Sequence, residues 1–289
     1  MERKINQMTE FFESMENIKT TNRDLKSPLY YAGGKTSFVK KYREAFPEKI
    51  EGRYYEPFLG GGGVLFNLHP KKATVSDLSD ELMNFYRVVK ENLFELFFEL
   101  LAFKNEKNAY YEVRNWDREN DYMELSNIER AARFYFLNQT SYAGLMRVNQ
   151  KGQMNAPFGY RDKEFYADVR VLTAVSSYLN KRNITLRTAD YKDALKRVRK
   201  GDFVFLDPPL IGDQGLTRRK FTFADYEELA KIVDELNEKG VKFLLVTENS
   251  KNIRNLFLNY EITEYDDVRY ISYNKDKRTG FKNIFIKNY

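Results

Sequence analysis

Four consecutive glycines, Gly60–Gly63, constrain the fold of this chain more than any other feature. They follow a strand signal at about Arg53–Glu56 and precede a helix start, an arrangement that lets the backbone approach a ligand closely. Further strand signals occur at Ala73–Ser76, Ile184–Arg187, Phe203–Leu206 and Lys242–Val246. An amphipathic helix, Phe223–Glu238, separates the last two, with Gly240 just past its end. Because strands alternate with helices, the sequence predicts an α/β fold with a doubly wound parallel sheet.

The pattern divides the chain into three units. They are an N-terminal amphipathic helix and linker, residues 1–26; a discontinuous sheet domain, residues 27–81 and 182–289; and a helical insertion, residues 82–181. The insertion contains a turn-rich segment, Tyr142–Gly159, and we expect it to form a second domain. Near the end of the chain, Val268–Ser272 and Asn283–Lys287 predict a final β-hairpin.

Composition excludes several classes of protein. The chain has no cysteine, which rules out disulfides, thiolate metal sites and cysteine nucleophiles. Its single histidine, His69, excludes multi-histidine metal sites and disfavours a Ser-His-Asp triad. No apolar run reaches the roughly 20 residues of a membrane-spanning helix, and the N-terminus lacks a signal peptide, so we expect a soluble intracellular protein. The net charge of +6 mildly favours nucleic acid over acidic partners.

The glycine run does not fit the dinucleotide fingerprint G-x-G-x-x-G. Its sixth position is Leu65 when counted from Gly60, and Phe66 when counted from Gly61. A hydride-transfer enzyme is therefore disfavoured. Asp77, at the end of the next strand, stands where an acidic side chain accepts both hydroxyls of a ribose. These residues taken alone also allow a tight turn followed by a helix-capping aspartate.

The strand at Phe203–Leu206 leads into the tetrad Asp207-Pro208-Pro209-Leu210. Two prolines lock the backbone at the carboxyl end of a parallel strand, where such sheets bind ligands. The Asp207 carboxylate and the Pro208 carbonyl can both accept hydrogen bonds. An exocyclic amine held between two acceptors loses conjugation with its ring and presents its lone pair. This arrangement suits attack on a sulfonium methyl without metal or histidine, although a bare Asp-Pro-Pro also occurs in structural turns.

Further segments stand in a fixed order around the tetrad. They are Tyr31-Ala32-Gly33-Gly34-Lys35, Glu56-Pro57-Phe58-Leu59-Gly60-Gly61-Gly62, Asp77 ahead of Ser79-Asp80-Glu81-Leu82, and Asp190-Tyr191. Together they resemble the Dam-type (D12 class) family of DNA adenine N6-methyltransferases over most of the chain beyond the N-terminal helix. The resemblance implies a Rossmann-like, S-adenosylmethionine-dependent methyltransferase sheet, with residues 82–181 as the DNA target-recognition domain. It also implies methyl transfer to adenine N6 in double-stranded DNA after the base swings out of the duplex.

The resemblance also implies a role for each site residue. The implied catalytic residues are Asp207, Pro208, Pro209 and Leu210. The implied S-adenosylmethionine site consists of Tyr31, Lys35, Phe58, Gly60, Gly62, Asp77, Asp190, Tyr191 and Asp207. The implied DNA contacts, mostly in a reading hairpin at 142–159, are Tyr30, Tyr142, Leu145, Arg147, Asn149 and Pro157. The family reads GATC there, so Arg147 is expected to read guanine, Leu145 and Pro157 to face thymine, and Tyr142 to act as a wedge.

Two positions depart from the family pattern. The fourth tetrad residue is normally aromatic and stacks on the extruded adenine, whereas here it is Leu210. Because stacking contributes roughly 1–3 kcal/mol, we expect attenuated rather than abolished activity. Tyr30 stands where GATC-specific members often carry a lysine for the first guanine. The target is therefore expected to be GATC with relaxed discrimination at that base pair, or a related site. Two basic segments, Asp213–Lys220 and Tyr273–Phe281, are interpreted either as phosphate-gripping loops or as solvated loops.

The overall expectation is a site-specific DNA adenine methyltransferase that is monomeric and needs neither a metal nor a membrane. We expect it to act in the cytoplasm of its own cell or, if it is viral, in that of a host. A rival from another class keeps the fold and both ligands but loses catalysis through Leu210. Methylation of cytosine N4 or of a protein glutamine is disfavoured because those families usually carry Ser or Asn where Asp207 stands. An RNA substrate is disfavoured because the hairpin resembles a duplex-DNA reader. A role in restriction-modification, in strand marking or in a virus is left open.

Overall fold

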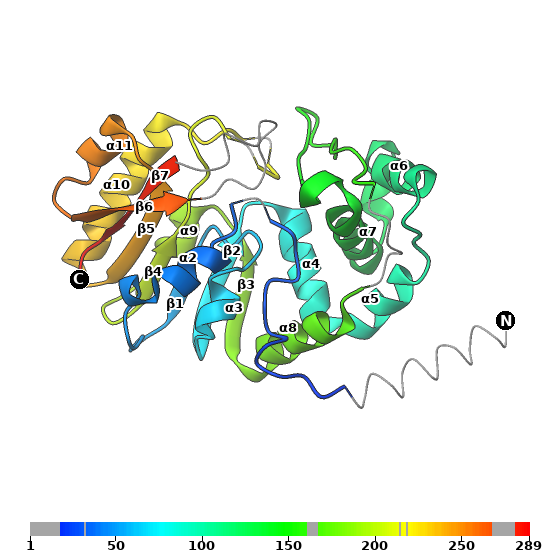
Figure 1. The fold of residues 1–289 in the computed structure, drawn as a ribbon, viewed down its shortest axis with the longest axis horizontal. Coiled ribbons are helices and arrows are strands. Elements are labelled where there is room, and N and C mark those ends of the chain that lie inside the picture. Colours follow the sequence, from blue (N-terminus) through cyan, green and yellow to red (C-terminus); the bar gives the residue numbers. More distant parts are fainter. Residues whose placement is uncertain (1–17, 32, 161–166, 214, 218, 268–280) are drawn as a thin grey trace.

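The computed structural model describes residues 18–31, 33–160, 167–213, 215–217, 219–267 and 281–289. Within the described residues, seven strands form one sheet in the order β3-β2-β1-β4-β5-β7-β6 (Figure 1). The strands are β1 (Tyr54–Glu56), β2 (Lys72–Asp77), β3 (Asn183–Thr188), β4 (Phe203–Leu206), β5 (Lys242–Glu248), β6 (Glu261–Asp267) and β7 (Phe281–Lys287). The first five are parallel, and β7 runs antiparallel to both β5 and β6. The predicted α/β sheet is confirmed, and all five predicted parallel strands are present.

The strand order reverses between β1 and β4. From β1 the chain moves outward to β2 and β3, and then returns to β4 and β5 on the other side of β1. In open α/β sheets, ligands bind in the crevice at the carboxyl ends of the two strands that flank such a reversal. The glycine run follows β1 and the tetrad follows β4, so the fold brings both to this crevice.

Alternation along the strands builds a core on each face of the sheet. In β4, Phe203 and Phe205 pack into one core while Val204 and Leu206 pack into the other. The second core lies under α9 (Tyr191–Leu195), α10 (Phe223–Glu238) and α11 (Lys251–Leu256). The first core continues from the sheet into the helical insertion, so one apolar interior joins the two parts of the chain.

The remaining helices cover the opposite face of the sheet and build the insertion. They are α2 (Thr36–Lys41), α3 (Leu65–Leu68), α4 (Asp80–Glu91), α5 (Leu93–Leu100), α6 (Lys107–Asn115), α7 (Asn127–Thr140) and α8 (Val169–Lys181), with short 3₁₀ turns η1 (Arg43–Ala45), η2 (Trp116–Arg118), η3 (Tyr122–Glu124) and η4 (Tyr142–Gly144). In Figure 1, α5, α6 and α7 stand beyond the β3 edge of the sheet. The boundary predicted between residues 81 and 82 falls inside α4, which packs against both α7 and the strands β2 and β3.

Some predictions concern residues outside the described part of the chain. The N-terminal helical spacing at residues 5–15 and the first strand of the predicted hairpin, Val268–Ser272, both lie there. The second hairpin strand is present within β7, and its described antiparallel partner is β6, which the sequence reading did not predict. Helix α10 has its predicted bounds because Thr222 and Asp225 form a capping box at its start. Within the described residues, no helix is long and apolar enough to cross a membrane.

Candidate active site

The first component of the site is the glycine loop after β1. The ring of Tyr31 lies directly on this loop, so that a Cβ on Gly60 or Gly61 would approach Tyr31 atoms to 2.7 Å. Gly60 also has a φ of +48°, in the region that favours glycine. Asp77, at the end of β2, accepts hydrogen bonds from the backbone N–H of Gly60 at 3.1 Å and of Ser79 at 3.0 Å. The loop is therefore fixed both to the first motif and to the neighbouring strand.

An ion pair joins the first motif to the tetrad. The Lys35 ammonium lies 2.9 Å from Asp207 Oδ1, and the two side chains are only 13% and 25% exposed. Lys35 also donates to the carbonyl of Gly33 at 2.7 Å. Burial raises the pKa of Asp207, and Lys35 opposes that rise by stabilising the carboxylate. Two segments far apart in the sequence thus meet at one charged pair inside the crevice.

A second carboxyl, Glu56, lies at the end of β1 beside this pair. Its side chain is buried and accepts a hydrogen bond from the Tyr54 hydroxyl at 2.8 Å. Burial raises the pKa of Glu56 to about 8, and the negative charge of Asp207 adds to the rise. At neutral pH Glu56 is therefore mainly protonated, which avoids two adjacent buried carboxylates.

The tetrad is held rigidly at the end of β4. The Pro209 carbonyl accepts a hydrogen bond from the Tyr226 hydroxyl at 3.2 Å, and that hydroxyl lies 2.7 Å from Thr247 Oγ1. Pro208 is buried, and Leu210 is half-buried at the edge of the cavity. Because the Pro209 carbonyl is engaged by α10, the Pro208 carbonyl is the better candidate to accept from a ligand.

The segment after the tetrad folds over the cavity. Gly212 N–H donates to the Phe221 carbonyl at 2.7 Å and Phe221 N–H to the Asp213 carbonyl at 2.9 Å, which closes the loop between them. Arg219 forms ion pairs with Asp190 and Asp225. This arginine therefore ties the loop to the sheet domain, whereas Lys220 is exposed and Arg218 lies outside the described residues.

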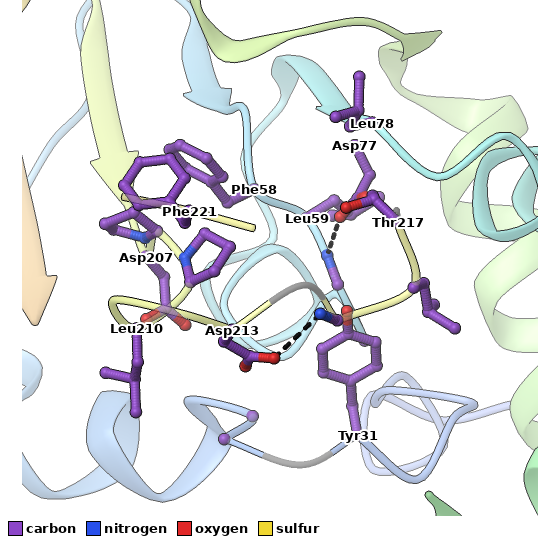
Figure 2. A pocket seen from close by; sticks show the side chains of 18 of the residues that line it. Tyr31, Phe58, Leu59, Asp77, Leu78, Asp207, Leu210, Asp213, Thr217 and Phe221 are labelled. Atoms are coloured by element: carbon purple, nitrogen blue, oxygen red, sulfur yellow. Dashed lines mark hydrogen bonds between the residues drawn. The ribbon is translucent and has the colours of Figure 1, made fainter. Parts of the chain in front are cut away.

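Aromatic rings form one wall of the cavity. Phe58 and Tyr191 are stacked, with ring centroids 5.3 Å apart, and Phe221 meets Phe58 edge-on at 6.0 Å. Asp190 caps α9 by accepting from Lys192 N–H at 3.0 Å. Figure 2 shows Phe58 and Phe221 close together near Asp207, with Asp77 on the opposite side of the cavity. The cavity has a volume of about 510 Å³ and is lined by both charged and aromatic groups.

The turn-rich segment of the insertion borders the same cavity. Tyr30 is bound at both backbone groups by the buried Asn138 of α7, with N–H to Oδ1 at 3.0 Å and Nδ2 to the Tyr30 carbonyl at 2.7 Å. A Cβ on Gly144 would lie 2.2 Å from Tyr30 Cβ, so the glycine is needed for this contact. Tyr142, next to Ala143 with its φ of +53°, is 53% exposed and is not among the residues that line the cavity.

A family model decides the relationship. The model of the D12 class N6 adenine-specific DNA methyltransferases matches residues 31–271. The chain belongs to this family. It is 32% identical to the type II methyltransferase M1.LlaDCHI of Lactococcus lactis, over 95% of this chain and 99% of that protein. It is 33% identical to the type II methyltransferase M.MjaIII of Methanocaldococcus jannaschii (92% and 100%), and 26% identical to a DNA adenine methylase of Vibrio cholerae (85% and 90%).

Most predicted site residues of this methyltransferase line one cavity. Those that do are Tyr30, Tyr31, Lys35, Phe58, Gly60, Asp77, Leu145, Arg147, Asp190, Tyr191, Asp207, Pro208, Pro209 and Leu210. Gly62 instead faces the interior, where a Cβ would lie 2.5 Å from the Phe66 ring. Asn149 and Pro157 lie in the hairpin: Asn149 donates to Gln153 Oε1 at 3.0 Å, and the Pro157 carbonyl accepts from Tyr142 N–H at 2.8 Å.

Several residues at the cavity were assigned no individual role from the sequence, although Asp213 and Thr217 belong to the basic segment Asp213–Lys220. They are Glu56, Leu78, Asp213, Thr217, Phe221, Asp267 and Asn283. Glu56 stood inside a recognised motif, and its strand-end position was the signal available. The others come from loops and from β6 and β7, whose approach to the crevice depends on the antiparallel end of the sheet. Among the described residues there is no group of three or more acidic or histidine side chains that could hold a metal ion.

Proposed function

We propose that this methyltransferase transfers a methyl group from S-adenosylmethionine to adenine N6 in duplex DNA at GATC. The observation that carries the proposal is the Lys35–Asp207 ion pair at 2.9 Å. It joins the first motif to the tetrad at the strand-order reversal, between the glycine loop and the reading hairpin. The reaction centre and the DNA-reading segment therefore border one cavity.

The residues of the cavity fit the proposed donor. Its volume of about 510 Å³ is in the range of cofactor sites, which are roughly 300–1,000 Å³. Asp77 offers a carboxylate suited to ribose hydroxyls, and the Phe58–Tyr191 pair offers apolar faces suited to an adenine ring. Tyr31, Lys35, Gly60 and Asp190 complete the proposed binding set. When bound, S-adenosylmethionine supplies an electrophilic methyl group on a sulfonium.

The tetrad performs the proposed work on the target base. Asp207 accepts one hydrogen bond from the exocyclic amine and the Pro208 carbonyl accepts another, so the nitrogen lone pair is directed toward the methyl group. Lys35 stabilises the carboxylate form of Asp207, and a carboxylate is a stronger hydrogen-bond acceptor for the amine than a protonated carboxyl. Leu210 lines the base pocket and replaces aromatic stacking by a weaker apolar contact.

The helical insertion, residues 82–181, is proposed as the target-recognition domain. Arg147 reads a guanine edge, because arginine binds guanine O6 and N7 bidentately. Leu145 and Pro157 face the thymine methyl, Tyr142 serves as the wedge, and Asn149 supports the hairpin. Two of the relatives are named type II methyltransferases, which supports a role in restriction-modification.

The test is methyl transfer from labelled S-adenosylmethionine to three duplexes: one with GATC, one with its first base pair changed, and one without a site. Labelled N6-methyladenine in the GATC duplex, and none in the duplex without a site, supports the proposal. Leu210→Tyr is expected to raise the rate about five- to a hundredfold, as the roughly 1–3 kcal/mol of base stacking implies.

Leu210 also favours a second candidate function, a DNA- and cofactor-binding form without turnover. If the unsubstituted protein is silent while Leu210→Tyr methylates, the binding form is the correct function. If both proteins are silent on every duplex, adenine methylation by this site is refuted.

A further inference from the structure

Two side chains outside every recognised motif, Asp117 and Arg118, bind the backbone of the reading hairpin. Asp117 Oδ2 accepts a hydrogen bond from the backbone N–H of Met154 at 2.6 Å. Arg118 Nη2 donates to the carbonyl of the same residue at 2.8 Å. Both backbone groups of Met154, which is itself buried, are thus bound by two consecutive residues of η2.

Asp117 is part of a buried charged cluster. It forms an ion pair with Arg133 of α7 at 2.8 Å, and the two side chains are only 9% and 6% exposed. It also pairs with Arg118. Arg133 in turn donates to the carbonyls of Val113 at 2.9 Å and Arg114 at 2.7 Å. Because the aspartate sits between two guanidinium groups that are themselves anchored, its oxygens have little freedom to move.

Met154 and its neighbour Asn155 contact the segment that carries Arg147, so fixing Met154 also restrains Arg147. Met154 pairs with Val148 in an antiparallel bridge. The next residue, Asn155, donates its N–H to the Arg147 carbonyl at 2.9 Å and accepts from Arg147 Nε at 2.9 Å through its Oδ1. Asn155 therefore fixes the position of the Arg147 main chain through its backbone N–H. Its side-chain oxygen fixes the direction of the Arg147 guanidinium group.

We propose that Asp117 and Arg118 are positioning residues for DNA sequence discrimination: they set the register of the reading hairpin and so aim Arg147. The inference deepens the proposed function and rests on the assignment of this hairpin to base reading. Neither residue lines the cavity, so they act on the target through Met154 and Asn155 and not by touching the reacting groups. A bidentate arginine contact depends on orientation, so a small displacement is expected to reduce selectivity before it reduces catalysis.

The decisive variant is Asp117→Asn, which preserves size and one acceptor but removes the charge that holds the two arginines. We expect the preference for GATC over duplexes with a single changed base pair to fall about tenfold or more, in line with the roughly 1–3 kcal/mol that a bidentate base contact contributes. The KM for GATC duplex should rise. The kcat at saturating DNA and the dissociation constant for S-adenosylmethionine should change less than threefold.

A second variant and a control guard against a general loss of stability. Arg118→Met removes the bonds to the Met154 and Arg114 carbonyls and the ion pair with Asp117. It leaves the buried Asp117–Arg133 pair, so the variant is expected to fold and to show the same loss of discrimination. The matched control is Asp202→Asn. Asp202 is also buried and accepts two backbone N–H bonds, from Arg53 at 2.7 Å and Arg199 at 3.0 Å, but at the other end of β4. Its substitution should lower thermal stability without changing discrimination.

The readouts are competition binding of labelled duplexes and steady-state methylation of the same duplexes. Selective binding by the unsubstituted protein, lost in both η2 variants and kept in Asp202→Asn, supports the proposal even if methylation itself is not detected. Unchanged selectivity in Asp117→Asn and Arg118→Met overturns it, as does an equal loss of kcat on all duplexes. Equal binding of every duplex by the unsubstituted protein overturns both this proposal and the hairpin assignment, whereas selective binding without methyl transfer refutes only the proposed reaction.

Discussion

Replacement of Glu56 by glutamine is expected to remove a large part of the pH dependence of folding stability. The Glu56 carboxyl is buried at the end of β1, and its pKa is raised to about 8 from an ordinary value of 4.5. A group whose pKa is higher in the folded state binds its proton more tightly there. Its contribution to stability is therefore fully present below pH 4.5, and it is lost as the pH rises toward and through 8.

The size of the effect follows from the two pKa values. They differ by about 3.5, and each pH step between them corresponds to about 1.4 kcal/mol of unfolding free energy. Between pH 5.5 and pH 8.5, titration of Glu56 is expected to lower the unfolding free energy by about 3 kcal/mol. Glutamine resembles the protonated carboxyl in shape and does not titrate, so this component disappears in the variant. Its oxygen can still accept from the Tyr54 hydroxyl.

The assay is urea denaturation of the two proteins at pH 5.5, 7.0 and 8.5, with the unfolding free energy extrapolated to water. The difference between variant and unsubstituted protein should shift in favour of the variant by about 3 kcal/mol across this range. Glu235→Gln is the control, because Glu235 is 64% exposed on α10 and its substitution should leave the pH dependence unchanged. A difference between Glu56→Gln and the unsubstituted protein that stays constant with pH would refute the argument, because Glu56 would then be ionised like an exposed glutamate.

Three further substitutions test the site directly. Lys35→Met removes the charge that lowers the pKa of Asp207, so the acid limb of the kcat/KM profile should move to higher pH. At pH 7, kcat/KM should fall at least about tenfold because the charged hydrogen bond is missing. An unmoved acid limb would contradict the role of Lys35. Gly61→Ala places a Cβ 2.7 Å from Tyr31 Cβ, so calorimetric binding of S-adenosylmethionine should weaken about tenfold or more from the displaced Tyr31, while unchanged affinity would exclude this loop from the cofactor site. Tyr30→Lys adds a cation at the cavity mouth and should raise methylation of GATC over a first-base variant about five- to tenfold, which equal rates on the two duplexes would disprove.

Much of the sheet domain could be predicted from local sequence. Short apolar runs predict the five parallel strands, β1 to β5. The capping residues and Gly240 predict α10. Strand β6 was missed because its sequence, Glu261–Asp267, is largely acidic and only Tyr265 in it is buried, so the strand depends on pairing with β7 rather than on its own burial. The division at residue 82 followed the change from alternating strands and helices to helical patterns alone, but α4 spans it and packs against both α7 and the strands β2 and β3.

The sequence by itself determined the chemistry of this protein. The order of the glycine run, Asp77 and the Asp-Pro-Pro tetrad points to methyl transfer, because each motif carries its own local backbone requirement. Only the tertiary structure decided which charges meet: Lys35 with Asp207, Arg219 with Asp190 and Asp225, and Asp117 with Arg133. Such pairs join residues from different elements, and their strength depends on burial and distance, which spacing along the chain does not encode.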